Sequence, residues 1–260
     1  MSDLRVSVAV LSGVVLLSGA CRRAAARFGV ARSFLVEAAA TFQLCSCCQE
    51  LKLLADAARP GQWTELGLCF AVTTIHLLTL RGADCNPGGT LEKVFRGTRS
   101  VRAASLLVAG QFAAAVAAQQ FAASVWSLGL SDLHARHRRF GFRCFDPLGG
   151  SVMEAAAAEL ACAFVFQAAL MHVSDLKEQL RVPLVAATVT ALVYAGGGTS
   201  GAIYNPVLAF SVIFPCGGHT HLEYCFIYWL GPLLGMSSCI LLFEKILPFL
   251  SGKNHKHKLA

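Results

Sequence analysis

The chain has 260 residues, of which 55% are hydrophobic and only 14% charged, and its mean hydropathy is +0.58. This apolar content exceeds what a soluble core of this length needs, so the composition predicts a polytopic membrane protein. The net charge is +7, but the basic residues lie at the ends of apolar segments instead of along one face, which argues against a nucleic-acid partner. Most of the 11 cysteines lie inside apolar runs, where Cys behaves as a small hydrophobe, so their number says little about the redox compartment.

The first apolar segment, Val6 to Ala20, is followed at once by Arg22, Arg23 and Arg27. A helix over this segment reaches about 22 Å, which is short of the ~30 Å hydrocarbon core of a bilayer. The segment is therefore expected to be a signal anchor, an interfacial helix or a short extra span. Because the arginines follow the apolar stretch, a cleaved signal peptide is the less favoured interpretation.

Six further apolar runs predict membrane spans, at residues 33–54, 63–80, 101–130, 152–173, 182–194 and 222–243. A polar loop at 131–150, rich in arginine, separates the first three from the last three. The expected organisation is an N-terminal hydrophobic segment with a basic linker at 1–32, a membrane domain at 33–250 with halves 33–130 and 151–250, and a basic tail at 251–260.

A short signature occurs twice, as Gly-Ala-Asp-Cys-Asn-Pro at 82–87 and as Gly-Ala-Ile-Tyr-Asn-Pro at 201–206. The match extends further, because the first span of each half holds a Glu (Glu37 and Glu159) with a Phe five residues on. The Asn of the signature lies 49 residues after the first Glu and 46 after the second. These spacings predict an internal duplication that covers whole halves of the chain.

Each signature predicts the start of a helix, because Asn86 precedes Pro87 and Asn205 precedes Pro206. An Asn side chain caps free backbone N–H groups, and Pro fits the first helical position. Four glycines between residues 196 and 201 predict a tight turn into the second signature, and Pro215 ends the helix that follows. Half-helices in corresponding places of two membrane-embedded halves point to a central pore or binding site.

Glu37 and Glu159 are ionisable residues inside predicted spans, and such residues are functional candidates by default. The alternative for Glu37 is structural: its carboxylate accepts hydrogen bonds from loop backbone inside the bundle. We favour the structural interpretation.

The distribution of Lys and Arg predicts the orientation in the membrane. Most of them fall on the side that holds the start of the first span, the first half-helix and the C-terminus, and this side is expected to be cytosolic. The arginines of the 131–150 loop are an exception. Lys256 and Lys258 near the C-terminus resemble a dilysine retrieval signal read by a coat receptor, which predicts residence in the endoplasmic reticulum membrane. The alternative is a basic tail near anionic lipid.

The paired signatures, the two glutamates and a Gly231-Pro232 motif in the last span resemble the aquaporin family. The resemblance implies an all-α membrane protein. Its fold is a right-handed bundle of six transmembrane helices with two re-entrant half-helices in an inverted repeat, here with an extra N-terminal hydrophobic segment. Cys216 lies nine residues beyond Val207, a spacing similar to that of the divergent intracellular subfamily and taken as structural.

The chain departs from typical members at three positions. Gly88 and Val207 occupy places where Ala is usual after Asn-Pro, and Leu208 occupies the place where typical members have an Arg. The bulk of Val207 is expected to narrow or reshape the pore centre. The resemblance implies a constriction formed by four positions that are all apolar here, namely Leu66, Val193, Ala202 and Leu208.

The function implied is a passive channel for water, glycerol and hydrogen peroxide across an intracellular membrane, formed by a homotetramer with one pore in each protomer. Facing half-helix N-termini, with Asn86 and Asn205 as donors to the solute, are expected to exclude cations. The alternative is a poorly conducting protein of the same fold with a structural or organelle-homeostasis role, because an apolar ring can dewet. No paired acids, activated Ser or metal set is visible at a useful spacing, so neither enzymatic activity nor a cofactor is expected.

Several remaining residues allow two interpretations. Asp84 either faces the cytosolic vestibule or pairs with a loop Arg such as Arg81, and the paired interpretation is favoured. Cys144 and Cys216 map to the noncytosolic side, where they form a disulfide or Cys216 is simply buried. Three cysteines near residue 47 have no nearby partners to complete a zinc site. The histidines of the two noncytosolic loops are expected to be exposed, and such residues seldom sense pH; they are His134, His137, His219 and His221.

Overall fold

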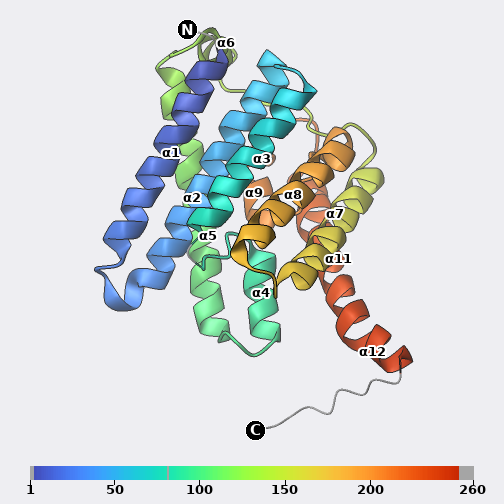
Figure 1. Cartoon of the computed structure of the whole chain (residues 1–260). Coiled ribbons are helices and arrows are strands. Elements are labelled where there is room, and N and C mark those ends of the chain that lie inside the picture. The colour runs from blue at the N-terminus through green and yellow to red at the C-terminus, as the bar shows by residue number, and fades with distance from the viewer. Residues whose placement is uncertain (1–2, 81, 252–260) are drawn as a thin grey trace.

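A computed structural model describes residues 3–80 and 82–251, and their regular secondary structure is helical. The long helices stand side by side in a bundle (Figure 1): α1 (Asp3–Ala25), α2 (Arg32–Leu53), α3 (Gln62–Thr79), α5 (Val101–Ser127), α7 (Val152–Val173) and α8 (Glu178–Ser200). The last column joins α10 (His221–Cys225), α11 (Gly231–Leu241) and α12 (Leu247–Leu250) through two π turns, Phe226–Leu230 and Leu242–Ile246. The shorter helices are α4 (Pro87–Phe95), α6 (Asp132–Arg139) and α9 (Pro206–Val212), and short 3₁₀ and π turns lie at Gly29–Ala31 and Leu54–Ala58.

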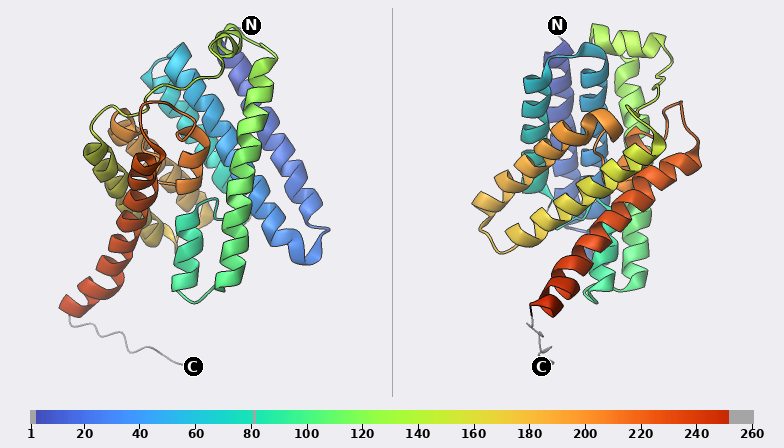
Figure 2. Two further views of the ribbon diagram at one scale, coloured as in Figure 1. Left: turned by 180° about the vertical axis from the view of Figure 1, so that it is seen from behind. Right: turned by 90° about the vertical axis from the view of Figure 1, so that its right-hand side faces the viewer.

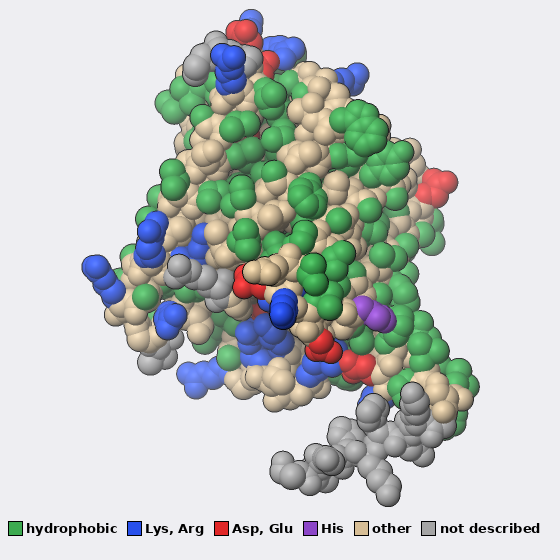
Figure 3. Space-filling view, viewed as in Figure 1, with side chains coloured by type: hydrophobic (Ala, Val, Ile, Leu, Met, Phe, Trp, Pro, Cys, Tyr) green, Lys and Arg blue, Asp and Glu red, His purple; other side chains and the backbone are tan. Residues whose placement is uncertain are grey.

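The bundle has two ends, which we call the α6 end and the α12 end (Figures 1 and 2). Helix α1 starts at the α6 end, where the Asp3 carboxylate accepts a hydrogen bond from the backbone N–H of Leu133 at 3.0 Å. Helix α4 runs toward the α12 end, and the chain leaves α9 toward the α6 end. On the face seen in Figure 3, hydrophobic side chains cover the middle and basic side chains gather toward the two ends, as expected of a membrane-spanning protein.

Five helices of the described residues are long and apolar enough to cross a membrane: α1, α5, α7, α8 and the column His221–Leu250. Helices α2 and α3, predicted as the first two spans, stand in the same bundle. Helix α2 carries the charged residues Glu37 and Glu50, and both are buried. These two carboxylates thus face the protein interior, as membrane-embedded ionisable groups usually do.

The N-terminal segment is longer than the sequence predicted. Helix α1 continues past Ala20 to Ala25, and its 23 residues reach about 35 Å, enough to cross a bilayer. The basic residue Arg22 does not end it, because its guanidinium is buried and donates to Gln43 Oε1 on α2 at 2.8 Å. Of the three interpretations, the dimensions favour an extra span packed along α2.

The glycines before the second signature do not form the predicted turn. Helix α8 continues through Gly196, Gly197 and Gly198 to Ser200, and Gly201 follows as its C-cap with a φ of +88°. The earlier glycines permit close packing instead. A Cβ on Gly196 would lie 3.1 Å from Cys162 Sγ, and the loop residue Gly149 lies so close that its Cβ would come within 1.9 Å of the Gly198 carbonyl oxygen.

The 131–150 loop contains a helix, α6, that the sequence analysis did not predict. Its residue His134 is fully buried, so the expectation of an exposed loop histidine was wrong. His134 Nε2 lies 3.0 Å from Glu50 Oε1, and the Glu50 carboxylate also accepts from Ser7 Oγ at 2.6 Å and Trp126 Nε1 at 2.8 Å. This cluster ties α1, α2, α5 and α6 together at the α6 end.

A disulfide joins Cys144, in the loop after α6, to Cys216, in the loop after α9. It closes a loop of 72 residues, which corresponds to about 4 kcal/mol of stabilisation if the unfolded chain is constrained as loop-closure models assume. The backbone N–H of Gly217 also donates to the Cys144 carbonyl at 3.0 Å. Of the two interpretations left open for this pair, the structure has the disulfide, and Cys216 is buried as well.

Candidate pore

Two buried carboxylates hold the segments that lead into the half-helices. Glu37 accepts from the backbone N–H groups of Asp84 at 2.9 Å and Cys85 at 2.7 Å. Glu159 accepts in the same way from Ile203 at 2.9 Å and Tyr204 at 2.5 Å. In each half the bound residues are the two that precede the Asn of the signature. A carboxylate that accepts several backbone hydrogen bonds restrains a loop more strongly than a neutral acceptor.

The held backbone is strained at matching positions. Cys85 and Tyr204, each directly before the Asn, have φ values of +53° and +33°, which are unfavourable for residues with a Cβ. Such conformations cost on the order of 1 to 3 kcal/mol and persist only where the surroundings determine them. The hydrogen bonds that Glu37 and Glu159 accept provide that determination, and they also satisfy backbone N–H groups that would otherwise lack partners.

The asparagines cap the half-helices as their chemistry predicts. Asn86 Oδ1 accepts from the N–H of Gly88 at 2.9 Å, and Asn205 Oδ1 accepts from Val207 at 3.1 Å. Asn205 Nδ2 donates across the centre to the Cys85 carbonyl at 2.8 Å. The N-termini of α4 and α9 therefore meet in the middle of the bundle, where their dipoles place partial positive charge.

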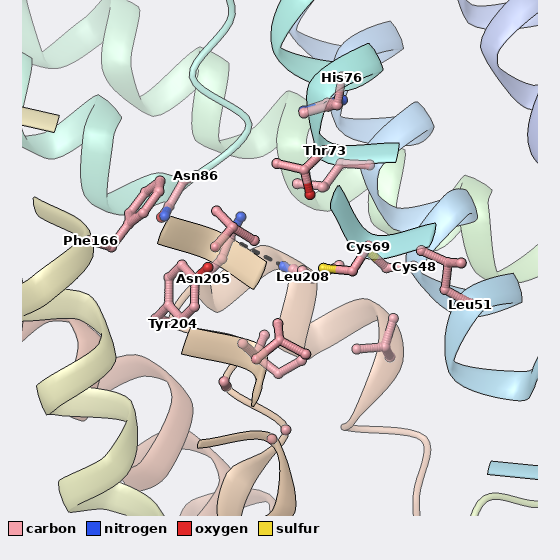
Figure 4. A pocket seen from close by; sticks show the side chains of 18 of the residues that line it. Cys48, Leu51, Cys69, Thr73, His76, Asn86, Phe166, Tyr204, Asn205 and Leu208 are labelled. Carbon is pink, nitrogen blue, oxygen red and sulfur yellow. Dashed lines mark hydrogen bonds between the residues drawn. The ribbon is translucent and has the colours of Figure 1, made fainter. Parts of the chain in front are cut away.

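A cavity of about 710 Å³ runs past this meeting point. Figure 4 shows Asn86, Asn205 and Leu208 among the residues that line it. All four residues of the expected constriction line this cavity: Leu66, Val193, Ala202 and Leu208. Of the two Asn-Pro motifs, the cavity-lining members are Asn86, Gly88, Asn205 and Pro206.

Val207 lies elsewhere. It is fully buried in an apolar cluster with Ala209 and Val212 of its own half-helix and with Tyr224 and Tyr228 of the last column. The expectation that its bulk narrows or reshapes the pore centre therefore finds no support in its position. Its β-branched side chain packs behind α9 instead.

Sequence reasoning missed an aromatic pair in the cavity wall. Phe166 of α7 and Tyr204 both line the cavity (Figure 4), with ring centroids 5.1 Å apart. The signal for Phe166 was present, because it follows Glu159 by seven residues and so shares its helix face. The equivalent residue in the first half, Leu44, also lines the cavity. Tyr204 lies in a loop between α8 and α9, where helical periodicity does not predict which way a side chain points.

A polar stripe on α3 was also missed. Cys69, Thr73 and His76 lie three or four residues apart and line the cavity along α3 (Figure 4), on the same side as the predicted Leu66. This spacing is that of one helix face. The imidazole of His76 has two ring nitrogens that can form hydrogen bonds.

Ion pairs neutralise the carboxylates near the α12 end of the cavity. Asp84 is paired with Lys93 and Arg99. The pairing of Asp84 was expected, but with Arg81, which lies outside the described residues. Glu92, another cavity-lining residue, is paired with Arg96 at 2.8 Å. Neither acid therefore faces the solute path as an isolated negative charge.

Comparison with known proteins agrees with this geometry. The profile of the family "Major intrinsic protein" matches residues 65–243. The sequence is 36% identical to aquaporin-11 of Homo sapiens over 98% of this chain and 94% of that protein. The chain belongs to the aquaporin family. It is also 32% identical to aquaporin-12 of Mus musculus, over 98% of this chain and 90% of that protein.

The fold is similar to that of the aquaglyceroporin from Plasmodium falciparum, with a TM-score of 0.64 at 16% sequence identity over 85% of this chain and 98% of that one. The resemblance found in the sequence is thereby confirmed for the family and for the aquaporin fold with an N-terminal hydrophobic helix. As an aquaporin, the chain is a multi-pass membrane channel for passive movement of small solutes. Its family consists of transporters rather than enzymes.

Proposed function

We propose that the chain is a channel for small neutral solutes, namely water, glycerol and hydrogen peroxide, in an intracellular membrane. The observation that carries the proposal is the cavity that passes both asparagines and the four apolar positions. Its lining extends from Asp56 and Gln62, toward the α6 end of the bundle, to Glu92 of α4, toward the α12 end. A neutral solute with lone pairs can accept hydrogen bonds from donors along such a path.

Ion exclusion follows from the half-helices. Their N-termini each correspond to roughly half a positive charge, and a cation that approaches them in a low-dielectric pore meets a large barrier. The paired state of Asp84 and Glu92 supports the proposal, since neither acid offers an uncompensated site to a cation. Neutral solutes do not meet this barrier.

The apolar ring supports passage of solutes other than water. Leu66, Val193, Ala202 and Leu208 provide no fixed cation and no side-chain donor. A ring without donors does not organise single water molecules, whereas the carbon face of a polyol packs well against Leu and Val. The aquaglyceroporin with a similar fold gives this proposal some support.

Assembly and location complete the proposal. We infer a homotetramer with one pore in each protomer, as the resemblance to aquaporins implies, and this can be checked by native mass spectrometry. We also infer residence in the endoplasmic reticulum membrane with a cytosolic C-terminus. Lys256 and Lys258, which would be read by a retrieval coat, lie outside the described residues. Microscopy of a tagged chain with both lysines replaced tests this signal.

Leu208→Arg is the decisive variant for the solute preference. Water, glycerol and peroxide fluxes are measured in proteoliposomes at matched protein density, with Leu208→Met as the apolar control. We expect glycerol or peroxide flux to fall about tenfold with Arg, corresponding to about 1.4 kcal/mol in the barrier, and water flux to change less. The control should retain wild-type fluxes.

Two outcomes contradict the proposal. If glycerol and peroxide pass Leu208→Arg as well as wild type, the ring does not select solutes. If verified wild-type assemblies pass none of the three solutes, the channel proposal fails, and a poorly conducting protein with a structural role takes its place.

A further inference from the structure

A row of buried polar side chains connects the extra N-terminal helix to the cavity. Arg22 of α1 is 3% exposed, Gln43 of α2 is 1% exposed and His76 of α3 is 8% exposed. Arg22 donates through Nη2 to Gln43 Oε1 at 2.8 Å. Gln43 Nε2 in turn lies 3.0 Å from Thr79 Oγ1 and 3.4 Å from His76 Nδ1. Both Gln43 and His76 line the cavity.

The chemistry of Arg determines the orientation of the Gln43 amide. A guanidinium has only donors, so the amide atom that faces Arg22 must be the oxygen. The Gln43 nitrogen therefore faces Thr79 and His76, and it has two hydrogens for these two neighbours. The Thr79 hydroxyl is free to accept one of them, because its own hydrogen is directed to the Ile75 carbonyl at 2.8 Å.

The same logic determines the tautomer of His76. Because Gln43 Nε2 can only donate, the His76 Nδ1 atom that faces it must be an acceptor. A neutral imidazole with an unprotonated Nδ1 carries its proton on Nε2, as the hydrogen bond of the other ring nitrogen dictates. The ring thus keeps one N–H group that Gln43 does not use, on a residue of the cavity wall.

His76 stands well apart from the apolar ring. It follows Leu66 by ten residues on α3, which is about 15 Å along the helix axis. Since α3 runs from the α6 end toward the α12 end (Figure 1), His76 lies nearer the α12 end than Leu66 does, and we call that part of the cavity the inner pore. The two parts of the cavity wall differ chemically, because the four positions of the ring are apolar and His76 has a hydrogen-bond donor.

We infer that Arg22 and Gln43 are positioning residues that hold His76 in the Nε2-protonated form, so that His76 is a solute-contacting selectivity residue of the inner pore. The extra helix α1 is then part of the transport machinery, because it supplies the charge that orients the chain of hydrogen bonds. The role of His76 in transport rests on the proposed channel function, whereas the state of its ring does not.

Nitrogen-15 NMR of histidine-labelled protein in lipid tests the state of the ring, with the His76→Gln spectrum used for assignment. We expect the neutral Nε2-protonated tautomer in wild type, and a mixture of ring states in Gln43→Leu and Arg22→Gln. A charged or Nδ1-protonated His76 in wild type overturns the inference. So does an unchanged ring state in both variants when thermal unfolding and gel filtration show that they are folded.

Flux measurements test the role in transport. His76→Leu should lower glycerol flux about fivefold, the effect of one net hydrogen bond, while His76→Gln, which keeps an N–H donor, should retain most of it. Arg22→Gln should lower the ratio of glycerol to water flux about threefold. The matched control is Arg23→Gln. Arg23 is exposed and donates through Nε to the Gly19 carbonyl of its own helix at 3.3 Å, so its replacement should leave the ratio unchanged.

The outcomes separate the two claims. If wild type conducts and His76→Leu has wild-type glycerol flux, the selectivity role is wrong. Equal effects of Arg22→Gln and Arg23→Gln on the flux ratio overturn the positioning role. If wild type does not conduct, the proposed function fails, while the NMR result still decides whether Arg22 and Gln43 hold the ring.

Discussion

Glu37 in the first half and Glu159 in the second bind the two backbone N–H groups before each asparagine. Each carboxylate also has one side-chain donor, Gln111 Nε2 at 2.7 Å for Glu37 and Ser200 Oγ at 2.6 Å for Glu159. The donors come from different helices, α5 and α8. The backbone of the two halves is nevertheless held in the same way. In each half the residue directly before the asparagine, Cys85 or Tyr204, has a positive φ.

The residues of the two signatures themselves, from the asparagine onward, have different contacts in the two halves. Both asparagines line the cavity and cap their own helices, but Asn205 also donates to Cys85 O, which links the halves. Gly88 lines the cavity, while Val207 at the matching place packs in the apolar core. The groups that fold each re-entrant loop are thus duplicated, and the groups around the solute path are not. Selectivity can change in this fold while the loop scaffold stays intact.

The largest effects are expected at Glu37 and Glu159, where variants test whether the two re-entrant loops are held equally strongly. Glu37→Leu and Glu159→Leu each leave two buried backbone N–H groups and a side-chain donor without an acceptor. We expect each to lower the free energy of unfolding by about 4 kcal/mol, and the Gln variants, which keep one acceptor oxygen, by about 2 kcal/mol. SDS titration in mixed micelles measures both. If the two Leu variants differ by more than about 2 kcal/mol in the free energy of unfolding that they lose, the two halves are held differently.

The asymmetry of the asparagines predicts a smaller effect. Asn205→Asp keeps the oxygen that caps α9 but loses the donor to Cys85 O and places a carboxylate beside that carbonyl. We expect a loss of about 3 kcal/mol in the free energy of unfolding. Asn86→Asp keeps its cap at a helix N-terminus, where negative charge is favourable, and should stay within about 1 kcal/mol of wild type. Equal losses in the two variants would remove the proposed link between the halves.

The smallest effect is expected where typical aquaporins have Ala. Val207→Ala removes two methyl groups from a fully buried site and should cost about 2 kcal/mol in stability with fluxes unchanged. Gly88→Ala places a Cβ 3.2 Å from Asn86 Oδ1 and 3.3 Å from Met236 Sδ. It should change stability by less than about 1 kcal/mol but alter glycerol flux about twofold. Unfolding titrations and flux assays on both variants check this, and a reversed pattern would contradict the assignment of Val207 to the core.

Local sequence signals predicted the helices well where neighbouring residues alone determine where a helix begins or ends. The Asn-Pro pairs predicted the starts of α4 and α9, because capping depends on neighbouring residues alone. Residues 152–173 were predicted to the residue as the span α7. The glycines at 196–198 were wrongly predicted to form a turn. Gly allows close packing as well as turns, and only the position of the neighbouring loop shows that these glycines allow close packing.

The polar clusters lay beyond sequence reasoning. His134 looked like an exposed loop residue, yet it is buried against Glu50, which lies 84 positions away. Arg22 looked like the end of a short segment, yet it is buried against Gln43. Both pairings depend on how α1 packs along α2. Hydrophobic periodicity does not contain that information, because it reports which face of a helix is apolar and not which helix will cover it.

By itself the sequence determined the family, the duplicated halves, the helix starts at both asparagines and the apolar character of the four positions expected to form the constriction. These properties follow from residue identity and local spacing. Only the tertiary structure decided that α1 is long enough to span and packs on α2, that Cys144 pairs with Cys216, that Val207 faces the core and that His76 faces the cavity. Those outcomes depend on contacts between residues far apart in the chain, and a buried polar group takes whatever partner the packed helices bring within hydrogen-bonding distance.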